Sequence, residues 1–207
     1  LMANLRKKWF LKPNFHKIRT LYNLPKKKNY YVVVFHSVTE DIKNLKKHFR
    51  ILFKSLEKSK YKKIWILPNN DPGSSLIKDL LMISRNDSNL IYENFPREHY
   101  LEIMMNSKLI IGNSSSGIIE SASFKLPAIN IGRRQNNRLK GKNVINVPKV
   151  SEKEILKAIK MTDSKNFLKK ISKIKNLYGD GKSSERIVSI LKNMLNQKSL
   201  IVKEMTY

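Results

Sequence analysis

Residues 30–35 read Tyr30-Tyr31-Val32-Val33-Val34-Phe35, an unbroken β-branched and aromatic run. Such a run is typical of a strand that is buried on both faces, because neither face carries the polar side chains that solvent requires. Outward from it, five further short apolar runs follow along the chain, and stretches with helical spacing separate them. These runs begin at Ile64, Leu90, Leu109, Ala128 and Asn143.

The alternation predicts an α/β fold, a Rossmann-like parallel sheet with helices on both faces. In such sheets ligands bind outside the carboxyl ends of the strands, where loops lead into helices. Residues 1–29 do not fit the repeat, and we expect them to be a linker between domains. Residues 30–207 are expected to form one Rossmann-like domain. Two capping-box patterns, Ser37 to Glu40 and Ser151 to Glu154, predict helix starts.

Composition narrows the classes of function. The 207 residues include 42 Lys and Arg against 16 Asp and Glu, a net charge of +26, and no Cys. The absence of Cys excludes disulfide scaffolds, thiol nucleophiles and Cys-based metal sites. A nucleic-acid partner is one interpretation of the charge. The basic set, however, is 33 Lys and only 9 Arg, alongside 21 Asn, which favours a solvated surface shaped by composition. No apolar run is long enough for a membrane span or a secretory signal, so a cytoplasmic protein is expected.

The loop Gly112-Asn113-Ser114-Ser115-Ser116-Gly117 follows a predicted strand and precedes a helix. Its small residues would let backbone N–H groups approach an anion, although an ordinary Gly-Ser turn has the same composition. Glu120 is expected about one turn inside that helix, where its carboxylate could hold the vicinal diol of a ribose or simply stabilise the helix dipole. Together the loop and the acid are what a nucleotide diphosphate requires.

Other strand ends carry further candidates. His36 could hydrogen-bond a diphosphate or act as an acid, or it could be a packed histidine. Arg134 could hold a phosphate or belong to a generic basic loop. The segment Asn69-Asn70-Asp71 would bind polar groups or form an Asx turn. In contrast, Gly179-Asp180-Gly181-Lys182-Ser183 lacks the first glycine of a Walker motif and is expected to be a turn before the last helix.

Four spaced motifs resemble those of UDP-N-acetylglucosamine 2-epimerases, and specifically the hydrolysing branch that feeds sialic-acid and related nonulosonate synthesis. The resemblance covers roughly residues 30 to 195, which correspond to the C-terminal half of a family member. The motifs are Pro68-Asn69-Asn70-Asp71-Pro72-Gly73-Ser74, Gly112 to Gly117 with Glu120, Ile131-Gly132-Arg133-Arg134-Gln135, and Tyr178-Gly179-Asp180-Gly181.

The resemblance implies one half of a GT-B-type architecture, in which two Rossmann-like domains face each other across a cleft and the C-terminal domain holds UDP. It implies no metal and no cofactor. It implies that His36 lies near the diphosphate and aids catalysis, that Ser114 and Ser115 hold phosphate, and that Glu120 holds ribose. It also implies that Asn69 contacts the nucleotide, that the backbone at Phe95 contacts uracil, and that Arg134 makes a further UDP contact.

In the family, UDP leaves as the sugar loses its C2 proton, which gives a 2-acetamidoglycal. Water then adds at C1 while C2 is reprotonated from the other face, and free N-acetylmannosamine results. The carboxylates for these steps come from the N-terminal domain, so this chain is expected to bind UDP or UDP-N-acetylglucosamine without turning it over. A homo-oligomer is expected at full length. The alternatives are the donor domain of a GT-B glycosyltransferase and a basic nucleic-acid-binding module.

Overall fold

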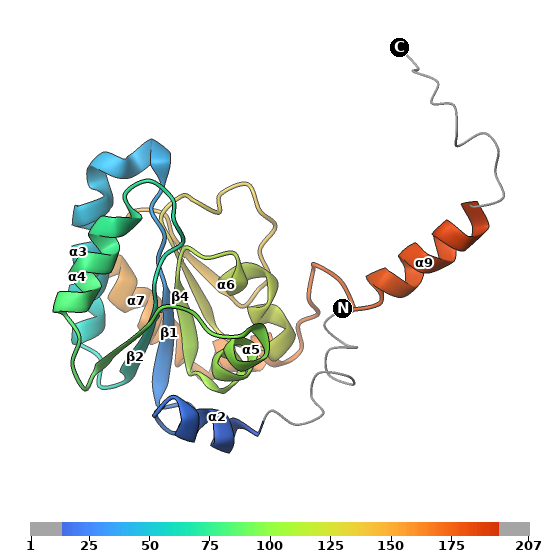
Figure 1. The fold of residues 1–207 in the computed structure, drawn as a ribbon, viewed down its shortest axis with the longest axis horizontal. Helices are drawn as coiled ribbons and strands as arrows, with labels where there is room; N and C mark the ends of the chain where they lie inside the picture. The colour runs from blue at the N-terminus through green and yellow to red at the C-terminus, as the bar shows by residue number, and fades with distance from the viewer. Residues whose placement is uncertain (1–13, 195–207) are drawn as a thin grey trace, which may run out of the picture. The chain divides into compact units, whose positions relative to one another are not determined.

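The computed structural model describes residues 14–194 and is drawn in Figure 1. The chain divides into two compact units, one ending at Leu177 and the other beginning at Tyr178. Each unit is described by itself below.

The first unit is built on a six-stranded sheet in which all neighbouring strands are parallel. The strand order is β3-β2-β1-β4-β5-β6, which is the Rossmann order. The predicted fold class is therefore confirmed, and each predicted strand is present. The strands are β1 Tyr30–Val34, β2 Lys62–Ile66, β3 Asn89–Tyr92, β4 Leu109–Gly112, β5 Ala128–Ile131 and β6 Val144–Val147.

Helices cover both faces of this sheet, and the alternation of side chains along β1 explains why. Tyr31 and Val33 belong to a core shared with α3, α4 and α7, whereas Val32 and Val34 belong to a second core shared with α2 and α5. Figure 1 shows α3 and α4 on one side of the sheet and α5 and α6 on the other. The helices are α2 Phe15–Leu21, α3 Leu45–Glu57, α4 Ser74–Ile83, α5 Arg97–Asn106, α6 Ser116–Ile119, α7 Glu152–Thr162 and α8 Lys165–Ser172, with 3-10 turns η1 Thr39–Asn44 and η2 Ser121–Phe124.

Helix α2 lies within the stretch expected to be a linker. Phe15, Ile18 and Leu24 are buried, and the Phe15 ring stacks on the Tyr30 ring with centroids 6.5 Å apart. The expected linker thus includes a helix that packs against the sheet and contributes apolar side chains to its second core.

One of the two expected capping boxes does not form. Val38 precedes η1, and no side chain caps that turn. Ser37 is buried, and among residues 14–194 its hydroxyl has no hydrogen-bond partner. At the other position, Ser151 accepts a hydrogen bond from the Glu154 N–H at 3.4 Å and caps α7, as predicted.

The second unit contains the turn expected before the last helix. Gly179 and Gly181 adopt φ angles of 126° and 86°, and α9 Ser183–Met194 follows. The apolar residues Ile187, Val188 and Leu191 are exposed on α9. Among residues 14–194, no helix has the length and apolar character to span a membrane.

Candidate functional site

A cleft of about 580 Å³ lies where the loops after β1, β2, β3 and β4 meet. It is at the carboxyl ends of the strands, beside the β1–β4 pair where the strand order reverses, which is where open α/β sheets bind ligands. Its volume is in the range of small-molecule sites. Six of the seven predicted site residues line it, namely His36, Asn69, Phe95, Ser114, Ser115 and Glu120.

The serine loop begins with an unusually close approach between two strands. Gly112 ends β4 with a φ of 141°, and a Cβ atom there would lie 1.9 Å from the Val34 carbonyl oxygen. Only glycine fits, because any side chain would displace β1. Within residues 14–194, no acceptor is found for the backbone N–H of Ser114 or Ser115. The loop therefore has donors available for an anion in the cleft.

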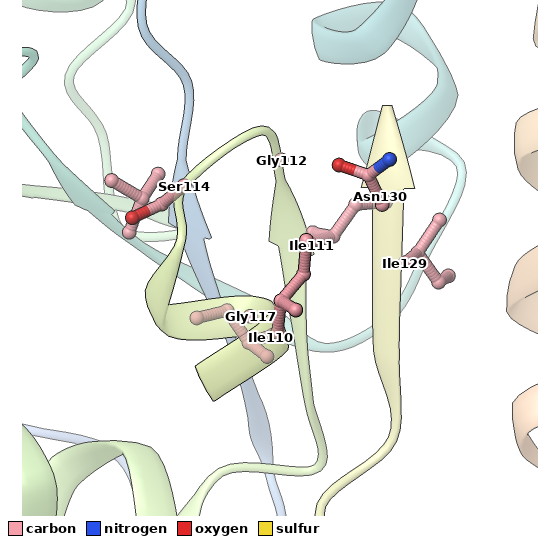
Figure 2. A pocket seen from close by; sticks show the side chains of 9 residues that line it. Ile110, Ile111, Gly112, Ser114, Gly117, Ile129 and Asn130 are labelled. Carbon is pink, nitrogen blue, oxygen red and sulfur yellow. The ribbon is translucent and has the colours of Figure 1, made fainter. Parts of the chain in front are cut away.

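Beneath this loop is a second, much smaller void. Figure 2 shows residues that surround it, namely Ser114, Gly112 and Gly117 with Ile110 and Ile111 of β4 and Ile129 and Asn130 of β5. Its volume is about 10 Å³, about the size needed for one water molecule. The larger cleft is therefore the space in which a nucleotide could fit.

His36 is held by side chains from two other strand ends. Its Nδ1 lies 3.0 Å from Asn69 Oδ1. The Asn113 side chain accepts from the His36 N–H at 2.7 Å and donates to the His36 carbonyl at 2.8 Å. Burial, with a smaller contribution from the charge of Arg134, lowers the pKa of His36 against the opposing effects of Asn69 and Asp71. The backbone N–H of Asn69 also donates to Nδ1 at 3.4 Å. In the tautomer that accepts this bond, Nε2 carries the proton of the ring and can donate it to an anion.

Glu120 occupies a different helical position from the one predicted. Because α6 ends at Ile119, Glu120 lies at the junction with η2 and not inside a longer helix. Its Oε1 accepts a hydrogen bond from Nη2 of Arg97 at 3.0 Å. The Glu120 side chain is 13% exposed and that of Arg97 is 51% exposed. Both residues line the cleft, so a side chain of α5 orients the carboxylate within the wall of the cleft.

Arg134 lies outside the lining of the cleft. Its Nη1 is 3.4 Å from the Asn113 carbonyl oxygen, and its Nη2 is 3.7 Å from Asp71 Oδ2. The neighbouring Gln135 is buried and donates to the same carbonyl at 2.9 Å. The loop after β5 therefore supports the serine loop through Asn113.

Phe95 belongs to an aromatic group behind the loop that follows β3. Its ring meets that of Tyr22 edge to face at 4.9 Å and lies 4.7 Å from that of Tyr92. The Tyr22 hydroxyl is 2.8 Å from His99 Nδ1. Tyr22, the residue that follows α2, thus stabilises this part of the cleft wall.

Sequence reasoning missed several residues of this site, among them Arg97, Tyr100, Asn113 and Gln135. Asn113 and Gln135 stand inside two of the quoted motifs, next to Ser114 and Arg134. Arg97 and Tyr100 are on α5, and no local pattern distinguished them from surface residues.

Comparison with known proteins gives consistent results. A family model described as UDP-N-acetylglucosamine 2-epimerase matches residues 7–192. The chain is 34% identical over 165 residues to a UDP-N,N'-diacetylbacillosamine 2-epimerase (hydrolyzing) of Legionella pneumophila, covering 79% of this chain and 42% of the relative.

Solved structures agree on the fold. A Staphylococcus aureus MnaA–UDP co-structure has a TM-score of 0.69 at 18% identity, covering 100% of this chain and 55% of that one. A Methanocaldococcus jannaschii UDP-GlcNAc 2-epimerase in complex with UDP-GlcNAc and UDP has a TM-score of 0.65 at 21% identity, covering 92% and 51%. The chain spans less than half the length of the curated relatives that it matches.

Proposed function

The chain belongs to the UDP-N-acetylglucosamine 2-epimerase family, and we propose that residues 30–207 are the UDP-binding C-terminal domain of such an enzyme. The observation that carries the proposal is the cleft at the β1–β4 switch point, whose lining includes six residues expected at UDP. Residues 1–29 would connect this domain to an N-terminal Rossmann-like domain in a GT-B-type arrangement.

In this proposal the diphosphate binds the N–H and hydroxyl groups of Ser114 and Ser115, with His36 beside it. Glu120 accepts hydrogen bonds from the two ribose hydroxyls, a role that suits a partly buried carboxylate held by Arg97. Uracil then lies along the backbone at Phe95. Asn69 orients His36 at the nucleotide through the 3.0 Å contact.

Arg134 is proposed to act from behind the cleft wall. It supports the serine loop through the Asn113 carbonyl, and its positive charge lies close enough to His36 to affect the pKa of that residue. The same charge would attract the diphosphate.

The whole enzyme would convert UDP-N-acetylglucosamine, or a diacetamido-trideoxy relative, to the free 2-epimeric sugar and UDP. The C1–O bond breaks with its electron pair leaving on UDP, and a carboxylate of the other domain takes the C2 proton. Water then bonds to C1, and C2 receives a proton on the opposite face. His36 would stabilise the negative charge on the departing UDP. We further propose a cytoplasmic homo-oligomer that serves sialic-acid-type sugar synthesis.

The test is titration calorimetry of the purified chain with UDP. Glu120→Ala should weaken UDP binding about tenfold or more, because a charged acceptor of two ribose hydrogen bonds is lost. Glu57→Ala, an exposed acid at the end of α3, is the matched control and should leave the affinity unchanged. Failure to bind UDP, together with salt-sensitive nucleic-acid binding that both variants retain, would instead support the basic binding module.

A further inference from the structure

Three hydroxyl groups form a connected chain in the wall of the cleft. The Tyr100 hydroxyl is 2.6 Å from Ser116 Oγ, and Ser116 Oγ is 3.1 Å from Ser114 Oγ. All three residues line the cleft: Tyr100 comes from α5, Ser114 from the loop after β4, and Ser116 from the start of α6. Only Ser114 is among the residues expected to bind UDP.

A hydroxyl has one proton, so the direction of such a chain is set at its ends. If Ser114 donates its proton to a phosphate oxygen, its own oxygen is free to accept the proton of Ser116. The Ser116 oxygen can then accept the proton of Tyr100. The reverse direction would leave Ser114 facing the diphosphate with lone pairs alone, which repel an anion.

We propose that Tyr100 and Ser116 are positioning residues for the diphosphate, and that they act by fixing the Ser114 proton toward it. The inference rests on the proposed function, because it assumes that the diphosphate binds at Ser114. It adds two residues that the resemblance does not assign.

The surroundings of Tyr100 suit the donor end of the chain. Burial raises the pKa of the Tyr100 phenol above its ordinary range, so the group keeps its proton at neutral pH. A phenol is also a better donor and a poorer acceptor than an aliphatic hydroxyl. Donation along a chain polarises each following hydroxyl, which strengthens the last bond, here the one from Ser114 to phosphate.

The inference distinguishes ligands by their phosphates. The affinity for UDP should fall when a hydroxyl is removed from the Tyr100–Ser116–Ser114 series. The affinity for uridine, which has no phosphate, should not change. A purely structural role of Tyr100 would weaken both ligands alike, because it would act through the shape of the whole cleft.

The experiment measures UDP and uridine binding by calorimetry and NMR titration for five variants of the full chain, one of them a double variant. Tyr100→Phe and Ser116→Ala should each weaken UDP about three- to tenfold and change uridine affinity less than about twofold. Tyr30→Phe is the matched control, because its phenol also donates to an α5 acceptor, the Ile103 carbonyl at 2.7 Å, away from the cleft. In a Ser114→Ala background, Tyr100→Phe should have no further effect on UDP.

Unchanged UDP affinity, an equal loss for uridine, or a full additional loss in the Ser114→Ala background would each overturn the inference. Thermal melts establish that the variants are folded. If Tyr100→Phe does not fold, Ser116→Ala interrupts the same series of hydroxyl groups at a second position. A wild-type chain that binds no UDP overturns the proposed function and this inference with it. A wild-type chain that binds UDP while these variants match it overturns the inference alone.

Discussion

His36 is a titratable residue of the site whose protonation depends on its burial. Burial and the nearby Arg134 charge disfavour its protonated form, so the pKa of His36 in the folded chain is lower than in the unfolded chain. The unfolded value is about 6.5. As the pH falls below that value, the unfolded chain takes up a proton before the folded chain does, and the folded state loses stability.

His36→Gln should therefore reduce the loss of stability between pH 7 and pH 5. The sign follows from the direction of the shift: above the unfolded pKa both states are neutral at this residue, and the cost of protonation grows as the pH falls toward the folded pKa. Urea denaturation at several pH values measures it. His16→Gln, at an exposed position on α2, is the control and should keep the wild-type profile. Equal pH profiles for His36→Gln and wild type would contradict the prediction.

Asn113 shows what sequence reasoning could and could not establish about the site. Asn113 follows a predicted buried strand, and the small polar residues around it predicted a loop there. That prediction needed only the local sequence. Its two hydrogen bonds to the backbone of His36 join residues 77 positions apart, and its carbonyl accepts from Gln135 of a third loop. Such contacts depend on strand order, which no local pattern contains.

The close approach of β1 and β4 is the element-scale feature on which the site depends. Parallel pairing brings Val34 opposite Gly112, and the absent Cβ allows the chain to turn into the serine loop. The ends of these two strands then carry His36 and Ser114 on the same cleft. A side chain at position 112 would separate the strands at this point.

Gly112→Ala should destabilise the domain by about 3 kcal/mol or more, because the new methyl group would overlap the Val34 carbonyl in a backbone conformation that alanine avoids. Gly117→Ala is the control: its nearest neighbour would be Ile110 Cγ2 at 3.9 Å, an ordinary contact. That variant should change the unfolding free energy by no more than about 1 kcal/mol. Comparable melting temperatures for the two variants would contradict this account.

Strands were easier to predict than helix ends in this chain. A strand such as Tyr30–Val34 is apolar on both faces, and few other elements of this length produce that pattern. Helix α6 is shorter than its apolar pattern suggested because the chain turns again at Ser121. Helix α2 was not predicted because its seven residues are too few to show a clear helical pattern. Only its tertiary contacts make Phe15 and Ile18 core residues.

At the scale of the molecule, the net charge of +26 says little about the cleft. Its lining mixes both signs, with Lys78 and Arg97 against Glu93 and Glu120. Such a mixture suits a ligand that presents both an anionic diphosphate and a hydroxyl-rich sugar. A uniformly basic groove, which a nucleic-acid backbone favours, would lack these acids.

The purified chain should bind UDP and release none from UDP-N-acetylglucosamine. Proton removal at C2 needs a base in contact with the sugar, and we place that base in the other domain because the described cleft supplies groups for a nucleotide. The measurement is a coupled assay for released UDP, with calorimetry on the same sample to show that the nucleotide site is intact. Addition of an N-terminal domain from a relative, expressed with this chain, should restore turnover. Release of UDP by the chain alone would show that no carboxylate of another domain is required for proton removal at C2. It would overturn the proposal that nucleotide binding and proton transfer belong to different domains.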